Sequence, residues 1–144
     1  MSGGFLIDTN VVSELRKGER ADAGVRAWFD EHKADQLWLS VLVVGELRRG
    51  VELLRRRDEQ AGTRLSDWLD TVAHDFDDRI IPITVEVAER WAALNVPDPV
   101  PVVDGLLAAT ALERDRVLVT PTTADVERTG VAVVNPFAGS GTIT

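Results

Sequence analysis

Four acidic residues stand where a carboxylate can take part in chemistry: Asp8, Glu46, Asp104 and Asp125. Asp8 directly follows a short apolar run, and Asp125 follows another through a brief hydroxyl-rich segment. Glu46 and Asp104 fall in the first turns of two expected helices. Because open α/β sheets bind ligands at the carboxyl ends of their strands, we expect these four side chains to converge on one cleft there.

A cluster of carboxylates limits the chemistry that the cleft can support. Neighbouring carboxylates in a partly buried site repel one another, which raises their pKa values or requires a cation. The chain has no cysteine, and its two histidines show no metal-ligand spacing. The remaining oxygen ligands suit Mg²⁺ or Mn²⁺. Such ions activate water and stabilise charge on phosphoryl oxygens, so the residues indicate a metal-dependent phosphodiester or phosphoryl enzyme.

Each acid also has a simpler interpretation. Asp8 can cap a helix, Glu46 and Asp104 can each favour the positive end of a helix dipole, and Asp125 can cap a turn toward Arg128. These alternatives are adequate for single residues, least so for Asp104, which has apolar neighbours on both sides. They do not explain why all four acids fall at matching edges.

The elements that must position these acids follow from hydrophobic periodicity. Short apolar runs predict strands over residues 5–7, 37–39, 79–83, 117–119 and 131–134. Amphipathic spacing predicts helices over residues 11–17, 23–33, 41–57, 63–76 and 102–114, with another after Thr84. Thr9 or Asn10, then Ser40, suit helix N-caps, Gly18 suits a helix end, and Pro101 suits a helix start. This alternation predicts an α/β fold with a short, mainly parallel central sheet flanked by helices, in an order of strands that the pattern leaves open.

Composition is that of an ordinary single-domain protein. The chain has 144 residues, 44% of them hydrophobic, and no apolar run near the roughly 20 residues of a membrane helix. We expect one domain over residues 1–137, a flexible tail over residues 138–144, no membrane partner and a cytoplasmic location. The formal net charge of −8 opposes non-specific attraction to nucleic acid, unless a local patch of basic residues binds the phosphate backbone.

Four segments together resemble the PIN domain, and more narrowly the VapC-type toxins of bacterial toxin–antitoxin pairs. The segments are Leu6–Asn10, Ser40 with Gly45–Gly50, Pro101–Ala111, and Val119–Thr120 up to Asp125. The resemblance runs from about residue 5 to residue 137. It implies a ribonuclease that uses Mg²⁺ or Mn²⁺, a homodimer, and a cognate VapB-type antitoxin.

By motif position, the resemblance implies that Asp8, Glu46 and Asp104 bind the metal and that Asp125 is a fourth, more variable ligand. Asn10 matches an amide that supports the first acid, and Thr120 matches the hydroxyl that follows the fourth strand. Thr9 and Ser40 are further candidates for supporting positions beside the acids. We expect a metal-activated water, held by this acidic cluster, to hydrolyse RNA phosphodiester bonds.

Two departures from the family pattern bear on this expectation. The family usually has Thr-Arg-Asn after the fourth strand, whereas this chain has Thr120-Pro121-Thr122, and Val43 stands where a threonine is common. The alternative function is therefore a catalytically weakened PIN-like subunit that binds RNA or protein. A phosphatase with an aspartyl nucleophile is a further alternative, although Asn10 occupies the place of its usual second aspartate.

Arginines crowd one predicted helix, at Arg48, Arg49, Arg55, Arg56 and Arg57. They can hold RNA phosphates in a groove, with Arg48 and Arg49 nearest to Glu46 in sequence. They can equally form a solvated face that pairs with Glu52, Asp58 and Glu59. The sequence leaves both interpretations open.

Overall fold

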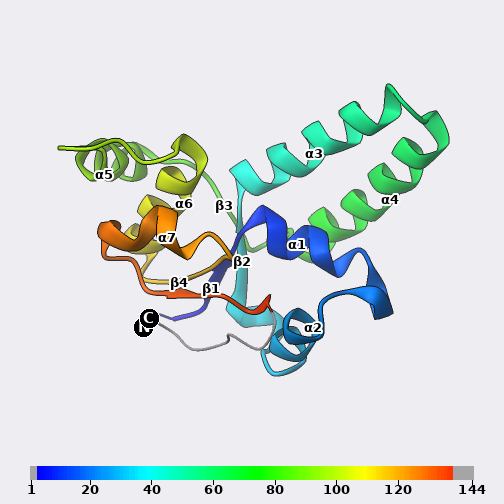
Figure 1. Cartoon of the computed structure of the whole chain (residues 1–144), viewed down its shortest axis with the longest axis horizontal. Coiled ribbons are helices and arrows are strands. Elements are labelled where there is room, and N and C mark those ends of the chain that lie inside the picture. Colours follow the sequence, from blue (N-terminus) through cyan, green and yellow to red (C-terminus); the bar gives the residue numbers. More distant parts are fainter. Residues whose placement is uncertain (1–2, 138–144) are drawn as a thin grey trace.

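The computed structural model describes residues 3–137 and is built around a parallel five-stranded sheet (Figure 1). The strand order is β3-β2-β1-β4-β5, and every pairing is parallel. The strands are β1 (Phe5–Ile7), β2 (Leu37–Ser40), β3 (Ile80–Ile81), β4 (Val117–Val119) and β5 (Val133–Val134). This confirms the predicted fold class. The expected tail over residues 138–144 lies outside the described residues.

Helices cover both faces of the sheet. They are α1 (Thr9–Leu15), α2 (Ala23–Asp30), α3 (Val41–Arg55), α4 (Glu59–Asp75), α5 (Val85–Leu94), α6 (Val102–Arg114) and α7 (Thr123–Val126). Figure 1 shows α1 to α4 on one side of the strands and α5 to α7 on the other. Right-handed crossovers require this arrangement, because the chain moves one way from β1 to β3 and the other way from β4 to β5. None of the described helices is long and apolar enough to span a membrane.

The sheet order creates a switch point between β1 and β4, where connections leave in opposite directions. Leu6 pairs with Leu118 and Ile7 with Val119, so the two strands end side by side. The backbone N–H of Asp8 then donates to the carbonyl of Val119 at 2.9 Å. Crevices at such a point are the usual ligand sites of open α/β sheets. The register therefore places Asp8 and Thr120 together at that edge.

Helix starts follow the expected chemistry, with two differences. Ser40 caps α3 by accepting from the backbone N–H of Leu42 at 3.0 Å, as predicted. The cap of α1 is Asp8, not Thr9 or Asn10, and its Oδ1 accepts from the N–H of Thr9 at 2.7 Å. α4 begins at Glu59 instead of residue 63, because the Asp58 side chain accepts from the N–H of Ala61. An acid before a helix satisfies N–H groups that otherwise lack partners.

Several predicted elements are longer than the observed ones. The helix expected over residues 23–33 ends at Asp30, since His32 turns its ring onto Trp28 and its Nδ1 lies 2.6 Å from the Trp28 carbonyl. The strand expected over residues 79–83 pairs only at Ile80–Ile81, because Pro82 has no N–H to continue the ladder. The helix expected over 41–57 ends at Arg55, and the strand expected over 131–134 pairs only at Val133–Val134.

One turn residue also differs from the prediction. Gly18 does not end α1, whose C-cap is Arg16, but opens a short 3-10 turn with φ of +60°. Pro101 stands at the start of α6 as predicted, in the N-cap position, and the bounds of α6 match the prediction.

Helices α3 and α4 run side by side as a hairpin that projects away from the sheet (Figure 1). The guanidinium of Arg48 on α3 donates to Ser66 Oγ at 2.9 Å and to Asp70 Oδ1 at 2.8 Å, both on α4. Gly62 lets the hairpin close, because a Cβ there would lie 2.3 Å from Cγ of Arg55. The hairpin therefore stiffens the helix that carries Glu46.

Candidate functional site

Asp8 is the centre of the acidic edge and is almost fully buried, at 5% exposed. Both of its carboxylate oxygens are used: Oδ1 caps α1, and Oδ2 accepts from the hydroxyl of Thr120 at 2.7 Å. Burial raises the pKa of Asp8, the bonds from Thr120 and Thr9 oppose that rise, and the charge of Glu46 adds to it. The fold thus holds a carboxylate in a place that disfavours its charge.

Glu46 lies opposite Asp8 on α3 and is exposed. The hydroxyl of Thr9, the first residue of α1, donates to Glu46 Oε1. Glu46 and the α1 N-terminus are thereby joined although they come from different helices. The Ser40 cap is the second support of this acid, because it fixes the start of the helix that carries Glu46.

Asp104 approaches from the other side of the sheet, in the first turn of α6. Burial, and next the charges of Asp8 and Asp125, raise its pKa to about 6, well above the usual 3.8. A hydrogen bond to Asp125 and the charge of Glu46 contribute the smaller parts of the same shift. All four predicted acids therefore interact with one another through Asp104.

Asp125 lies in the short helix α7 and not in a post-strand loop as predicted. Its backbone N–H donates to the carbonyl of Thr122 at 3.2 Å. Just beyond it, Arg128 donates to the carbonyls of Asp98 and Pro99, the latter at 2.7 Å. Arg128 therefore ties the segment of Asp125 to the loop that leads into α6 and Asp104.

A cavity of about 400 Å³ opens between these groups. Its walls come from the residue after β1, the start of α1, α3 and the start of α6. The lining residues are Asp8, Thr9, Asn10, Glu46, Pro101, Val102, Val103 and Asp104. Asn10 lines the cavity with an exposed side chain, and no hydrogen bond from it to Asp8 is present among the described residues. Asp125 contacts Asp104 from outside these walls.

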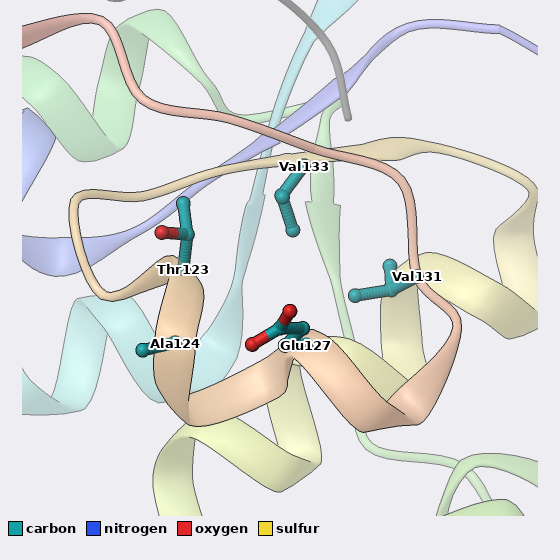
Figure 2. A pocket seen from close by; sticks show the side chains of 5 residues that line it. All are labelled: Thr123, Ala124, Glu127, Val131 and Val133. Atoms are coloured by element: carbon teal, nitrogen blue, oxygen red, sulfur yellow. The ribbon is translucent and has the colours of Figure 1, made fainter.

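A second cavity, of about 470 Å³, lies between α7 and β5 (Figure 2). Figure 2 shows its single carboxylate, that of Glu127, facing Val131 and Val133, with Thr123 and Ala124 on the side of α7. It contains none of the four acids. Of these two cavities in the described part of the chain, the first gathers acidic side chains from three separate segments, which makes it the candidate functional site.

The donor set of the first cavity fits a hard divalent cation. Its charged groups are carboxylates, and two of them have pKa values raised by burial and mutual repulsion, a cost that a cation removes. Within residues 3–137 no three of these side chains are already gathered closely enough to form a complete cage. Mg²⁺ keeps several waters and binds through few carboxylates, so such a cage is not required.

The comparisons with known proteins agree with this geometry. Residues 5–125 match the PIN domain family model. The chain belongs to the PIN domain family. The PIN domain match covers β1 to α7 and so includes all four acids.

Similar proteins include a ribonuclease and a toxin of nearly the same length. The chain is 30% identical to a VapC ribonuclease, Y4jK of Sinorhizobium fredii, over 92% of this chain and 97% of that protein. It is 31% identical to the toxin FitB of Neisseria gonorrhoeae, over 92% of this chain and 98% of that protein.

Solved PIN domain structures match as well. The FitAcB crystal structure from Neisseria gonorrhoeae has a TM-score of 0.84 at 31% identity, covering 92% of this chain and 97% of that one. The DNA-bound VapBC of Salmonella typhimurium has a TM-score of 0.76 at 19% identity, covering 93% and 98%, which bears on the fold alone.

Sequence reasoning missed one residue of this site. In the sequence, Thr122 is only the residue that replaces the family's usual asparagine. In the structure, its hydroxyl and its backbone N–H both form hydrogen bonds with the hydroxyl of Thr120. The signal was a hydroxyl two residues from another hydroxyl, a spacing that suits a local turn.

Proposed function

We propose that this chain is the toxin of a toxin–antitoxin pair and acts as an endoribonuclease dependent on Mg²⁺, with Mn²⁺ as a substitute. The observation that carries the proposal is the meeting of Asp8, Glu46 and Asp104 in one cavity at the switch point of the sheet. Resemblance to a VapC ribonuclease over nearly the whole chain supports the RNA substrate.

Asp8, Glu46, Asp104 and Asp125 are the residues that would hold the cation, directly or through water. When bound, the ion supplies an activated water and charge stabilisation on the phosphoryl oxygens. The residues of the chain prepare the site for it. Thr120 and the N–H of Thr9 fix the orientation of Asp8, and the Thr9 hydroxyl fixes Glu46.

Asp104 adds a carboxyl group whose charge is disfavoured in the empty cavity. Burial and the charges of Asp8 and Asp125 raise its pKa to about 6, so it holds its proton more tightly than a free aspartate does. A divalent cation held by these acids would compensate their negative charge and favour the ionised form of Asp104.

RNA must reach a strongly acidic protein, so its attraction has to be local. Arg49 is exposed on α3, three residues from Glu46, and we assign it to the phosphate backbone. Arg48 is a weaker candidate than the sequence indicated, because its guanidinium is engaged by Ser66 and Asp70.

We also propose a homodimer and a VapB-type antitoxin as protein partners in the cytoplasm. Large apolar side chains are exposed on α5 and around the start of α6, with Val85 at 68%, Val96 at 74% and Val102 at 61%. Such residues are compatible with a protein interface. The similar solved structures include a toxin–antitoxin complex from Klebsiella pneumoniae, which supports an antitoxin partner.

Cleavage of a total RNA pool tests the proposal. The chain is incubated with Mg²⁺, with Mn²⁺ or with EDTA, alongside Asp8→Asn and Asp104→Asn. We expect cleavage with either ion, none with EDTA, and a loss of at least about 100-fold in both variants. Asparagine is itself a good N-cap, so Asp8→Asn should keep α1 and the fold, which circular dichroism checks.

Assays of RNA binding and of phosphomonoester hydrolysis on the same proteins separate the alternatives. RNA binding without metal-dependent cleavage would favour a weakened PIN-like binding subunit. Hydrolysis of small phosphomonoesters without RNA cleavage would favour the aspartyl phosphatase. Retention of full RNA cleavage by Asp8→Asn, free of contaminating nuclease, would refute the assignment of the site.

A further inference from the structure

Three polar atoms surround the hydroxyl of Thr120, which is 1% exposed. Its Oγ1 lies 2.7 Å from Oδ2 of Asp8, 2.9 Å from Oγ1 of Thr122 and 3.1 Å from the backbone nitrogen of Thr122. A threonine hydroxyl has one proton to donate and two lone pairs to accept with. Three neighbours therefore use all of its hydrogen-bonding capacity.

The direction of each bond follows from counting protons. An ionised carboxylate only accepts, so the Thr120 proton points to Asp8. The backbone N–H of Thr122 only donates, and it fills one lone pair of Thr120. Because Thr120 has no second proton, the Thr122 hydroxyl must donate to the other lone pair. Rotation of the Thr120 hydroxyl away from Asp8 would break this arrangement.

The local backbone supports a dedicated role for Thr122. It is the N-cap residue of α7, a position where a threonine side chain commonly accepts from the helix, yet it makes no such bond here. Its hydroxyl turns to Thr120 instead. The preceding residue, Pro121, restricts the turn through its fixed φ.

We propose that Thr122 is a positioning residue for Asp8, acting through Thr120. Its hydroxyl and its N–H hold the Thr120 proton on Asp8 Oδ2, while its carbonyl accepts from the N–H of Asp125. Thr122 thus connects two acids of the site at the position where the PIN domain pattern usually has an asparagine. The relevance to cation binding rests on the proposed function.

Binding of Mn²⁺ to the full chain without RNA, measured by titration calorimetry, tests this role. Thr122→Val keeps the shape and the backbone N–H but removes the hydroxyl, and we expect it to weaken Mn²⁺ binding about 10-fold or more. Thr122→Ser restores the hydroxyl and should bind within about threefold of wild type. The melting temperatures of both variants should stay within a few degrees of wild type.

Thr129→Val is the matched control. Thr129 is a threonine in the segment after α7 whose hydroxyl donates to the Val126 carbonyl at 2.6 Å and accepts from the Val131 N–H at 3.3 Å. It has no bond to Asp8 or Thr120 among the described residues. We expect wild-type Mn²⁺ affinity in this variant. Equal weakening by Thr129→Val and Thr122→Val, or wild-type affinity in Thr122→Val, would overturn the proposal.

A metal-free measurement keeps the two proposals separable. The buried Thr120 hydroxyl proton should exchange slowly enough to be seen by NMR in the wild type and in Thr122→Ser, and should be lost in Thr122→Val. A wild-type chain that binds no Mn²⁺ and cleaves no RNA would overturn the proposed function, and the NMR comparison would then decide the role of Thr122 by itself.

Discussion

The carboxyl groups of Asp104 and Asp125 share a hydrogen bond although they lie on separate helices, α6 and α7. Burial, the charges of Asp8 and Asp125, and this bond together raise the pKa of Asp104 to about 6. Acids from α6, α7 and the start of α1 are therefore electrostatically coupled at the site.

The first prediction concerns pH. Since Asp104 has a pKa of about 6, protons compete with Mn²⁺ below that value, and affinity should fall roughly tenfold per pH unit as pH drops from 6 to 5. Asp125→Asn removes one negative charge and should move this onset to lower pH. Titration calorimetry of both proteins between pH 5 and pH 7.5 measures it, and a pH-independent wild-type affinity would contradict it.

The same raised pKa predicts the pH dependence of metal-free stability. The folded state holds the Asp104 proton more tightly than the unfolded state, so the stabilisation is complete below the usual value of 3.8 and is lost as pH rises toward 6. Urea unfolding in EDTA should therefore show this contribution of Asp104 falling across that window. Subtracting the curve of Asp104→Asn isolates it, and a difference that rises with pH would contradict the prediction.

Arg48 and Arg49 are neighbours in sequence with different expected roles. Arg48→Met removes the part-buried hydrogen bond to Ser66 and the exposed one to Asp70, both on α4. It should therefore lower the free energy of unfolding by about 1 kcal/mol. Mn²⁺ affinity should stay unchanged. Arg49→Met should keep stability and raise the KM for RNA. Unfolding curves and cleavage kinetics on both variants distinguish the roles, and a reversed pattern would assign RNA binding to Arg48.

Two glycines of the α3–α4 hairpin form a matched pair. Gly62→Ala places a Cβ 2.3 Å from Cγ and 3.0 Å from Cα of Arg55, and should destabilise the protein by about 1–3 kcal/mol. Gly50→Ala meets nothing within 4 Å and should stabilise α3 by up to about 1 kcal/mol. Denaturant unfolding measures both changes, and equal effects would show that the hairpin does not depend on close approach at Gly62.

Arg128 provides a prediction about the loop that leads to Asp104. Arg128→Met removes the donors to Asp98 and Pro99, so amide exchange of Val96, Asp98 and Val100 should become faster. Arg90→Met is the control. Arg90 on α5 donates to Glu113 on α6 at 2.8 Å, so its hydrogen bond joins the two helices on either side of the loop and not the loop itself. Hydrogen-exchange mass spectrometry compares them, and similar exchange in both variants would remove this role from Arg128.

The sequence was informative where a local pattern decides the structure. The apolar runs before Asp8 and before Thr120, and the apolar helix around Asp104, predicted strand ends and a helix start correctly, because burial imposes those patterns. The sequence also singled out three acids that share a cavity. Helix caps were harder, since Asp8, Thr9 and Asn10 all suit the N-cap, and only the folded geometry selects one.

What the sequence left open depends on contacts distant along the chain. The order of strands requires pairing between β1 and β4, which no local signal encodes. The raised pKa of Asp104 depends on burial and on the charges of Asp8, Asp125 and Glu46, which come from separate segments of the chain. Thr122 can act on Asp8 only after folding has brought Thr120 into hydrogen-bonding distance of Asp8. From the sequence alone, Thr122 therefore indicated only the loss of the usual asparagine side chain.

The central place of β1 in the sheet has a consequence for synthesis. Thr120 follows its partner Asp8 by 112 residues, and β4 cannot pair with β1 before it has been synthesised. The helices between the two strands can form before that pairing does. Under the proposed function, a ribosome that has not yet made β4 carries no complete nuclease site, and RNA cleavage begins only after β4 has emerged.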